Sequence, residues 1–334
     1  MKLAVVTAFA EGTWAGYADG WLRDAARLDV HGKHVVVDDP ETADAILFME
    51  GHSIQDVLME KVLSHPLRRR FPAKSFLYQD GDYAFPLMRG VYPSLRAPHQ
   101  HAGLAVGGVY LARIEENKSV TRARELQVPQ DLLYSFVGAN NCDVRNRILQ
   151  TKVPDTLTLD TSGRHAWALS TEERAAYESE YARTCARSRF MLSPRGIGPS
   201  TYRLYEAMEL GRCPVILADD WVPPPFVPWE DFSIRVPENQ VDRLPQLLAD
   251  LPYEALGRAA RRAWEDFIDR PHCFHYLAES LQQLLEQGHN ESTLQRYASL
   301  MGSDMRNLYL RSKLRTAKRG VLSALRPKRE TAAA

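Results

Sequence analysis

Short apolar runs alternate along the chain with segments of helical periodicity. Residues 2–8 have the pattern of a buried strand, residues 17–28 repeat apolar positions at helical spacing, and residues 43–50 (ADAILFME) form a second apolar run. The same alternation returns in the second half, where LLYSFVGA and CPVILADD flank segments with helical spacing. Strands that alternate with helices predict mostly parallel sheets with helices on both faces.

A polar stretch separates the two alternating series. Residues 115–131 (EENKSVTRARELQVPQD) show no periodicity and are the predicted linker. The sequence therefore predicts an α/β domain over residues 1–132, a second one over residues 133–300, and a tail over residues 301–334. In a chain of 334 residues, 45% of them apolar, each half is long enough for its own core.

A glycine-bearing turn stands out in the second half, in the stretch SPRGIGPSTYRLYEAMELGRCP (193–214). It joins a predicted strand to a predicted helix over residues 200–211. Gly196 and Gly198 let the backbone take a positive φ and approach a ligand closely. Ser200 is the expected cap of the helix, whose free amides form an anion-binding end.

Two arginines and one carboxylate surround this turn. Arg195 precedes it and Arg203 lies in the first helical turn, and a guanidinium group can hold phosphate oxygens bidentately. Glu206 lies on the same helix face as Arg203, where its carboxylate can accept hydrogen bonds from both ribose hydroxyls. The pattern predicts a diphosphate site that needs no metal. The same spacing also fits a surface ion pair beside an ordinary turn, and the residues alone leave both interpretations open.

The turn also imitates the dinucleotide-binding fingerprint. The sequence GIGPST (196–201) is followed by Asp219, about 20 residues on, at a predicted strand end. Thr201 replaces the third glycine, and the unit lies deep in the second half of the chain. An NAD-dependent oxidoreductase is therefore one alternative. A non-catalytic protein that binds a nucleotide or a glycan is the other.

The residues around the turn resemble the signature block of the exostosin family of glycosyltransferases. The family pattern runs through a PRG turn, a serine shortly before R-x-x-E-A, G-x-x-P-V, two tryptophans, a Pro-Phe pair and an R-V-P-E run. The residues that match it are Pro194, Arg195, Gly196, Ser200, Arg203, Glu206, Ala207, Gly211, Pro214, Val215, Trp221, Pro225, Phe226, Trp229, Arg235, Val236, Pro237 and Glu238.

This resemblance implies a GT-B fold, in which two Rossmann-like domains face a central cleft. It implies that the first domain binds the acceptor and that the second binds a nucleotide-sugar, usually a UDP-sugar, which is transferred with inversion. Arg195 and Arg203 would face the diphosphate and Glu206 the ribose. The predicted donor-site residues are Arg195, Gly196, Gly198, Ser200, Thr201, Arg203, Glu206 and Trp221, the last in the wall near the sugar.

An inverting transfer also needs a base for the acceptor hydroxyl, which should project from the first domain. Four residues follow predicted strands there, in order of preference Asp82, His52, Asp80 and Glu50. The two aspartates flank Gly81 in QDGDYAF, which also fits an ordinary loop turn. A lone histidine such as His52 is more often structural.

Cysteine spacing and charge set further limits. The four cysteines are dispersed without a CxxC pair, which argues against a disulfide framework or zinc site, and no metal or cofactor is expected. The net charge is zero, but residues 303–334 hold nine Lys and Arg against two acidic residues. Apolar residues interleave with these charges, so the tail is either a solvated end or a helix on an anionic membrane surface.

The remainder of the chain is acidic, which argues against nucleic acid as a partner. No apolar run reaches the ~18 residues of a membrane span. Eukaryotic members of the family commonly carry a membrane anchor, and this sequence has no such apolar run. We therefore expect a bacterial-type cytoplasmic enzyme, which the basic tail would make peripheral on the inner membrane. Its expected partners are a nucleotide-sugar and a glycan or lipid-linked saccharide.

Overall fold

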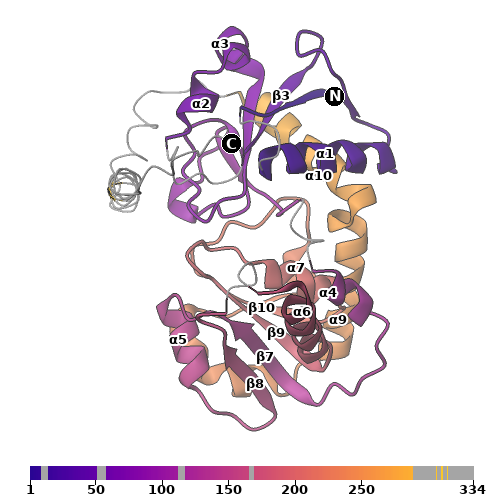
Figure 1. Cartoon of the computed structure of the whole chain (residues 1–334), viewed down its shortest axis with the longest axis vertical. Helices are drawn as coiled ribbons and strands as arrows, with labels where there is room; N and C mark the ends of the chain where they lie inside the picture. Colours follow the sequence, from indigo (N-terminus) through magenta and orange to yellow (C-terminus); the bar gives the residue numbers. More distant parts are fainter. Residues whose placement is uncertain are drawn as a thin grey trace, which may run out of the picture.

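Two parallel sheets with helices packed on them make up the part of the chain that the structure describes (Figure 1). The computed structural model describes residues 1–8, 14–50, 58–111, 117–164 and 169–288, together with residues 306, 310 and 314. No helix in these ranges is long and apolar enough to cross a membrane.

The first sheet has the strand order β2-β1-β3-β4-β5-β6, and all neighbouring strands are parallel. Its strands are β1 (Lys2–Val6), β2 (Val35–Val36), β3 (Ala45–Glu50), β4 (Ser75–Gln79), β5 (Gly90–Tyr92) and β6 (Ala105–Gly107). Every residue of β3 and β4 is buried, as expected for central parallel strands covered on both faces. The helices of this half are α1 (Trp14–Leu28), α2 (Glu60–Leu63) and α3 (Pro66–Arg70), with the short 3-10 helices η1 (Pro72–Lys74) and η2 (Ala97–His99).

The second sheet has the order β11-β10-β9-β7-β8, again with parallel neighbours. Its strands are β7 (Leu132–Gly138), β8 (Thr156–Asp160), β9 (Ser188–Pro194), β10 (Cys213–Leu217) and β11 (Ile234–Arg235). The helical elements are α5 (Asp143–Gln150), α6 (Thr171–Ala186), α7 (Tyr202–Glu209), η4 (Trp229–Asp231), η5 (Glu238–Arg243), α8 (Leu244–Leu248), α9 (Tyr253–Ala263) and η6 (Trp264–Ile268). The predicted fold class, two parallel α/β units as in GT-B, is confirmed.

The order of the second sheet reverses at β7, because β8 lies on one side of it and β9 on the other. In open α/β sheets ligands bind outside the carboxyl ends of the strands at such a switch point. The ends of β7 and β9 are Gly138 and Pro194, and the glycine-bearing turn follows the second of these.

The predicted linker contains a helix, α4 (Lys118–Ala123). Its buried residues Val120 and Ala123 pack with Ala182 of α6, so this segment belongs to the core of the second half. The polar composition hid this contact, because only two apolar side chains make it. The boundary near residue 132 stays a prediction.

The last long helix, α10 (Arg270–Gln287), returns to the first half of the chain (Figure 1). Phe274, Leu281 and Leu284 are buried in one cluster with Trp21 and Leu22 of α1. The prediction placed residues 133–300 in one domain and did not foresee this return. Apart from residues 306, 310 and 314, the basic tail lies outside the described residues.

Candidate functional site

The predicted donor turn lies at the carboxyl end of β9. Its glycines were expected to allow a positive φ, but the structure gives a different reason for them. Neither Gly196 nor Gly198 has a positive φ. A Cβ on Gly198 would instead lie 2.7 Å from the carbonyl oxygen of Asp82 and 2.9 Å from Oγ of Ser94. A Cβ on Gly196 would lie 3.0 Å from Nη2 of Arg145. Gly198 is required because backbone atoms of Asp82 lie against it, whereas the neighbour of Gly196 is the end of a side chain.

The helix after the turn begins later than predicted. Its first residue is Tyr202, and Thr201 is the N-cap in extended conformation, without a side-chain capping hydrogen bond. Ser200 is buried one position before the cap. The expectation that Ser200 caps the helix is therefore wrong, because the chain stays extended through Thr201.

Two guanidinium groups lie over the ring of Phe136, at the end of β7. The Cζ atoms of Arg145 and Arg203 are 5.5 and 5.3 Å from the ring centroid. Arg203 donates through Nε to the carbonyl of Val137 at 2.7 Å. Arg145, on α5, donates through Nε to the carbonyl of Arg195 at 2.8 Å. Strand ends thus hold both arginines at the switch point.

This pair concentrates positive charge in a poorly solvated place. Arg145 is only 6% exposed, and burial first and the charge of Arg203 second lower its pKa to about 10, which leaves it protonated at neutral pH. The charge of Asp82 opposes this shift. Within the described residues neither arginine forms an ion pair with a carboxylate. Because an unpaired buried charge is costly, the pair is suited to an anionic ligand.

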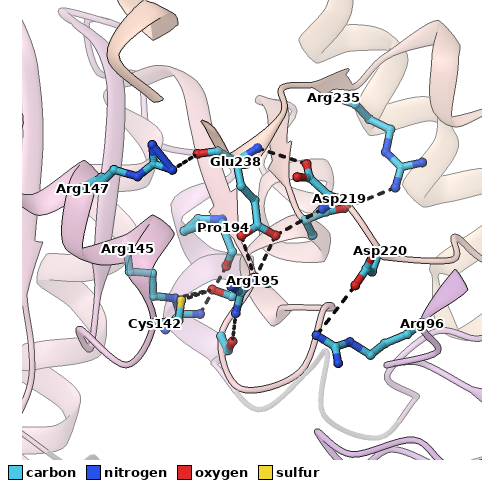
Figure 2. A network of polar contacts seen from close by, with 12 residues as sticks. Arg96, Cys142, Arg145, Arg147, Pro194, Arg195, Asp219, Asp220, Arg235 and Glu238 are labelled. Atoms are coloured by element: carbon cyan, nitrogen blue, oxygen red, sulfur yellow. Dashed lines mark hydrogen bonds and ion pairs between the residues drawn. The ribbon is translucent and has the colours of Figure 1, made fainter. Parts of the chain in front are cut away.

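Arg195 has a different environment, which Figure 2 shows. Its Nε contacts both carboxylate oxygens of Glu238, at 2.8 and 2.9 Å. The amide of Glu238 donates to Asp219 at 3.0 Å, and Arg147 donates to the carbonyl of Glu238 at 2.7 Å. The charge of Arg195 is therefore compensated, and its ion pair ties the R-V-P-E segment to the end of β9. Its predicted contact with a diphosphate stays a prediction.

Glu206 lies on α7 and faces the long helix α6. The hydroxyl of Tyr181 donates to its Oε2. Burial raises the pKa of Glu206, while Tyr181 and the charge of Arg203 oppose that rise. The carboxylate is thus held from one side by a buried phenol, and its role toward a ribose stays a prediction.

Trp221 is buried between the two halves of the chain. Its Nε1 donates to the carbonyl of Pro93 at 3.2 Å, and its ring centroid lies 5.2 Å from that of Trp229. The next amide, of Val222, donates to the carbonyl of Leu95 at 3.0 Å. The structure therefore gives Trp221 a place in the interdomain contact, and its expected position in the wall of a sugar pocket stays a prediction.

The candidate bases occupy different environments. Glu50 is fully buried at the end of β3, where its Oε1 accepts from the amide of Ala8 at 2.7 Å. Asp80 follows β4 and is also buried. Asp82 is exposed, and its backbone contacts the turn at Gly198. His52 lies outside the described residues.

Two residues of this site escaped sequence reasoning, namely Arg145 and Tyr181. Each lies on a different helix from Arg203, so no local spacing connects them. The signal that could identify Arg145 is its position on the helix that follows β7, the first strand of the second sheet. A helix in that position begins at the switch point.

Comparisons with known proteins place this site in a recognised domain. Residues 99–251 match the profile of the Exostosin GT47 domain. A probable glucuronosyltransferase of Oryza sativa subsp. japonica is 36% identical over 109 residues, which cover 32% of this chain and 25% of that protein. A probable beta-1,4-xylosyltransferase of Arabidopsis thaliana is 38% identical over 95 residues, or 28% of this chain and 22% of that protein. The chain thus spans about a quarter of the length of these plant relatives.

Two more distant similarities extend further along the chain. An exostosin-1 homolog of Caenorhabditis elegans is 24% identical over 173 residues, which cover 46% of this chain and 45% of that protein. The crystal structure of HepE from Anabaena, solved in complex with UDP, aligns with 86% of this chain and 99% of its own. At 10% identity and a TM-score of 0.41, that likeness is too low to support a functional inference.

Proposed function

We propose that this chain, which carries an exostosin GT47 domain across residues 99–251, is an inverting glycosyltransferase. Its donor is a nucleotide-sugar with UDP as the nucleotide, and its acceptor is a glycan or a lipid-linked saccharide. Two plant relatives, a probable glucuronosyltransferase and a probable beta-1,4-xylosyltransferase, support sugar transfer as the reaction class.

One observation carries the proposal. Arg145 and Arg203 are held by backbone carbonyls at the switch point of the second sheet, without an ion pair to any carboxylate of the described residues. A diphosphate would be the close ion-pair partner that neither guanidinium group has among the described residues. In this proposal Glu206, one helical turn from Arg203, accepts hydrogen bonds from the ribose hydroxyls.

In the proposed reaction the acceptor hydroxyl attacks the anomeric carbon while the nucleoside diphosphate leaves. The leaving group gains negative charge, which Arg145 and Arg203 are preplaced to stabilise. Asp82 accepts the proton of the attacking hydroxyl, because among the described candidates it is the exposed carboxylate beside the donor turn. The diphosphate is held by arginines, so binding of the nucleotide requires no metal.

The test is calorimetric titration of the full chain with UDP and GDP, followed by turnover with a panel of UDP-sugars and acceptors. We expect UDP binding that EDTA leaves unchanged, and release of UDP in the presence of an acceptor. No binding of either nucleotide at millimolar concentration would refute the proposal. Binding without turnover would support a non-catalytic protein, and binding of NADH in a fluorescence titration would support an oxidoreductase.

For the basic tail we propose contact with an anionic membrane, because residues 303–334 combine nine Lys and Arg with interleaved leucines. The measurement is co-sedimentation with vesicles of anionic phospholipid, with and without residues 303–334. Equal sedimentation of both proteins would contradict the contact.

A further inference from the structure

A group of histidines lies far from the donor site, where α10 meets the loop before β2. This group, called here the histidine cluster, consists of His31, His34, His272, His275 and Glu279. Nε2 of His34 is 2.6 Å from Oε1 of Glu279, and Nε2 of His31 is 3.1 Å from Nδ1 of His272. The rings of His31 and His275 stack with their centroids 3.9 Å apart.

Three members of the cluster have the geometry of metal ligands. His34, His275 and Glu279 each offer one ligand atom, and these atoms all lie within 4.8 Å of one another. His275 and Glu279 are four residues apart on α10 and therefore share one helix face. The third ligand comes from a loop more than 240 residues away along the chain.

Two buried ring nitrogens of this cluster have no hydrogen-bond partner among the described residues. The side chain of His34 is 0% exposed, and its Nδ1 has no hydrogen-bond partner among the described residues. Nδ1 of His275 is likewise buried and has none in that part of the chain. A buried polar atom without a partner costs free energy, and a bound metal ion would satisfy an imidazole lone pair.

We propose that His34, His275 and Glu279 bind a zinc ion. Imidazole nitrogens and a carboxylate oxygen are ligands that Zn²⁺ prefers, and three protein ligands leave a fourth position that water or a neighbouring histidine fills. Lys33 now contacts Oε1 of Glu279 at 2.7 Å. Its side chain is 53% exposed and can turn into solvent when the metal takes its place. The sequence did not predict this site, because its ligands lie far apart along the chain and come together only where α10 packs against the first half.

The bound ion would link the loop before β2 to α10 and so strengthen the contact between α10 and the first sheet. It lies outside the donor site, since none of its ligands belongs to the turn or to α7. The proposal therefore predicts an effect of zinc on unfolding and no effect on the affinity for UDP.

The experiment uses the full chain without a histidine tag, stripped of metal and titrated with Zn²⁺ against a chromophoric chelator. We expect one ion per chain, a higher unfolding temperature, and visible absorption bands when Co²⁺ replaces Zn²⁺. His275→Gln and Glu279→Gln should each weaken zinc binding at least about tenfold. His101→Gln, a histidine outside the cluster, is the matched control and should bind as the unchanged chain does.

Lys33→Gln gives a second check, because it removes the amine that competes for Glu279. It should bind zinc at least as tightly as the unchanged chain, and weaker binding would contradict the ligand assignment. Zinc binding that is equal in the unchanged chain and in His275→Gln, or no binding at micromolar zinc, would overturn the site. UDP affinity measured on the same samples separates this outcome from a failure of the proposed function.

Discussion

Arg145, Arg195 and Arg203 lie near the ends of β7 and β9, and each is held by different neighbours. Arg195 is held by the carboxylate of Glu238, so its charge is already compensated. Arg145 and Arg203 donate to carbonyl oxygens, which orient a guanidinium group without cancelling its charge. We therefore expect an incoming anion to bind to Arg145 and Arg203, and Arg195 to support the backbone around them.

Replacing Arg203 tests this division. Arg203→Ala should weaken UDP binding by about 10- to 100-fold, the effect of losing a charged hydrogen bond of ~1.5–3 kcal/mol. The matched control is Arg189→Ala, because Arg189 also donates to a backbone carbonyl and lies over a ring, that of Tyr253. Calorimetric titration measures both. Equal losses in the two variants would show that the effect comes from the fold and not from the site.

Glu206 should make both stability and binding depend on pH. Its pKa in the folded chain is raised above the ordinary 4.5, chiefly by burial. The folded state therefore keeps the proton to higher pH than the unfolded state, and the free energy of unfolding falls as pH rises from 4.5 through the raised pKa. UDP binding should tighten over the same interval, because the ionised carboxylate accepts hydrogen bonds from the ribose hydroxyls.

Glu206→Gln removes the titrating group with little change in shape. Chemical denaturation and UDP titration at several pH values should show flatter profiles for this variant. Glu172→Gln, which removes an exposed carboxylate of α6, is the control. If the Glu206→Gln variant kept the pH profiles of the unchanged chain, Glu206 would not be the source of the pH dependence.

Sequence reasoning at this scale found the residues that share a motif and missed those that do not. Arg203 and Glu206 were found because helical spacing puts them on one face. Arg145 and Tyr181 reach the site from α5 and α6, and only the packed sheet brings those helices to α7. The exposed and buried aspartates, Asp82 and Asp80, could not be told apart, because burial of a loop residue depends on what packs over it.

At the scale of elements, the donor turn packs closely against the first half of the chain, with Gly198 beside Asp82. Gly198→Ala would place a methyl group 2.9 Å from the Cα of Asp82 and 2.7 Å from its carbonyl oxygen, and backbone atoms cannot yield cheaply. We expect a loss of stability of about 1–3 kcal/mol, together with slower sugar transfer, because the turn and Asp82 are pushed apart. Denaturant unfolding and turnover measure the two effects.

Gly20→Ala serves as the control for this substitution. Gly20 lies in α1, and a Cβ there would meet nothing within 4 Å. Alanine should stabilise the helix by up to about 1 kcal/mol relative to glycine. If Gly198→Ala were as harmless, the close approach of turn and first domain would not exist in solution.

The elements themselves were largely predictable, for a plain reason. Apolar runs such as residues 43–50 and 213–218 become β3 and β10, since a central parallel strand is buried on both faces. The short helix α4 was missed, because its few apolar residues form no pattern until α6 covers them. The start of α7 was misplaced by two residues, since no side chain marks its cap.

At the scale of the whole molecule, the proposed transfer requires one half to hold the donor and the other to supply the base. Asp82→Asn should lower turnover by about 10²- to 10⁴-fold, the usual contribution of a general base, while UDP affinity changes little. Asp38→Asn is the control, because Asp38 is a carboxylate of the same half whose side chain is 99% exposed. Steady-state kinetics with UDP-sugar and acceptor compare them, and full activity in Asp82→Asn would leave the base unassigned.

The return of α10 has a consequence for how the chain comes into being. During synthesis the first half emerges early, yet Phe274, Leu281 and Leu284, which complete its core, are made among the last residues of the described chain. Until then α10 cannot cover the apolar side of α1 and its neighbouring strands. We therefore expect a fragment that ends at residue 131 to expose this surface and to be less stable than the full chain.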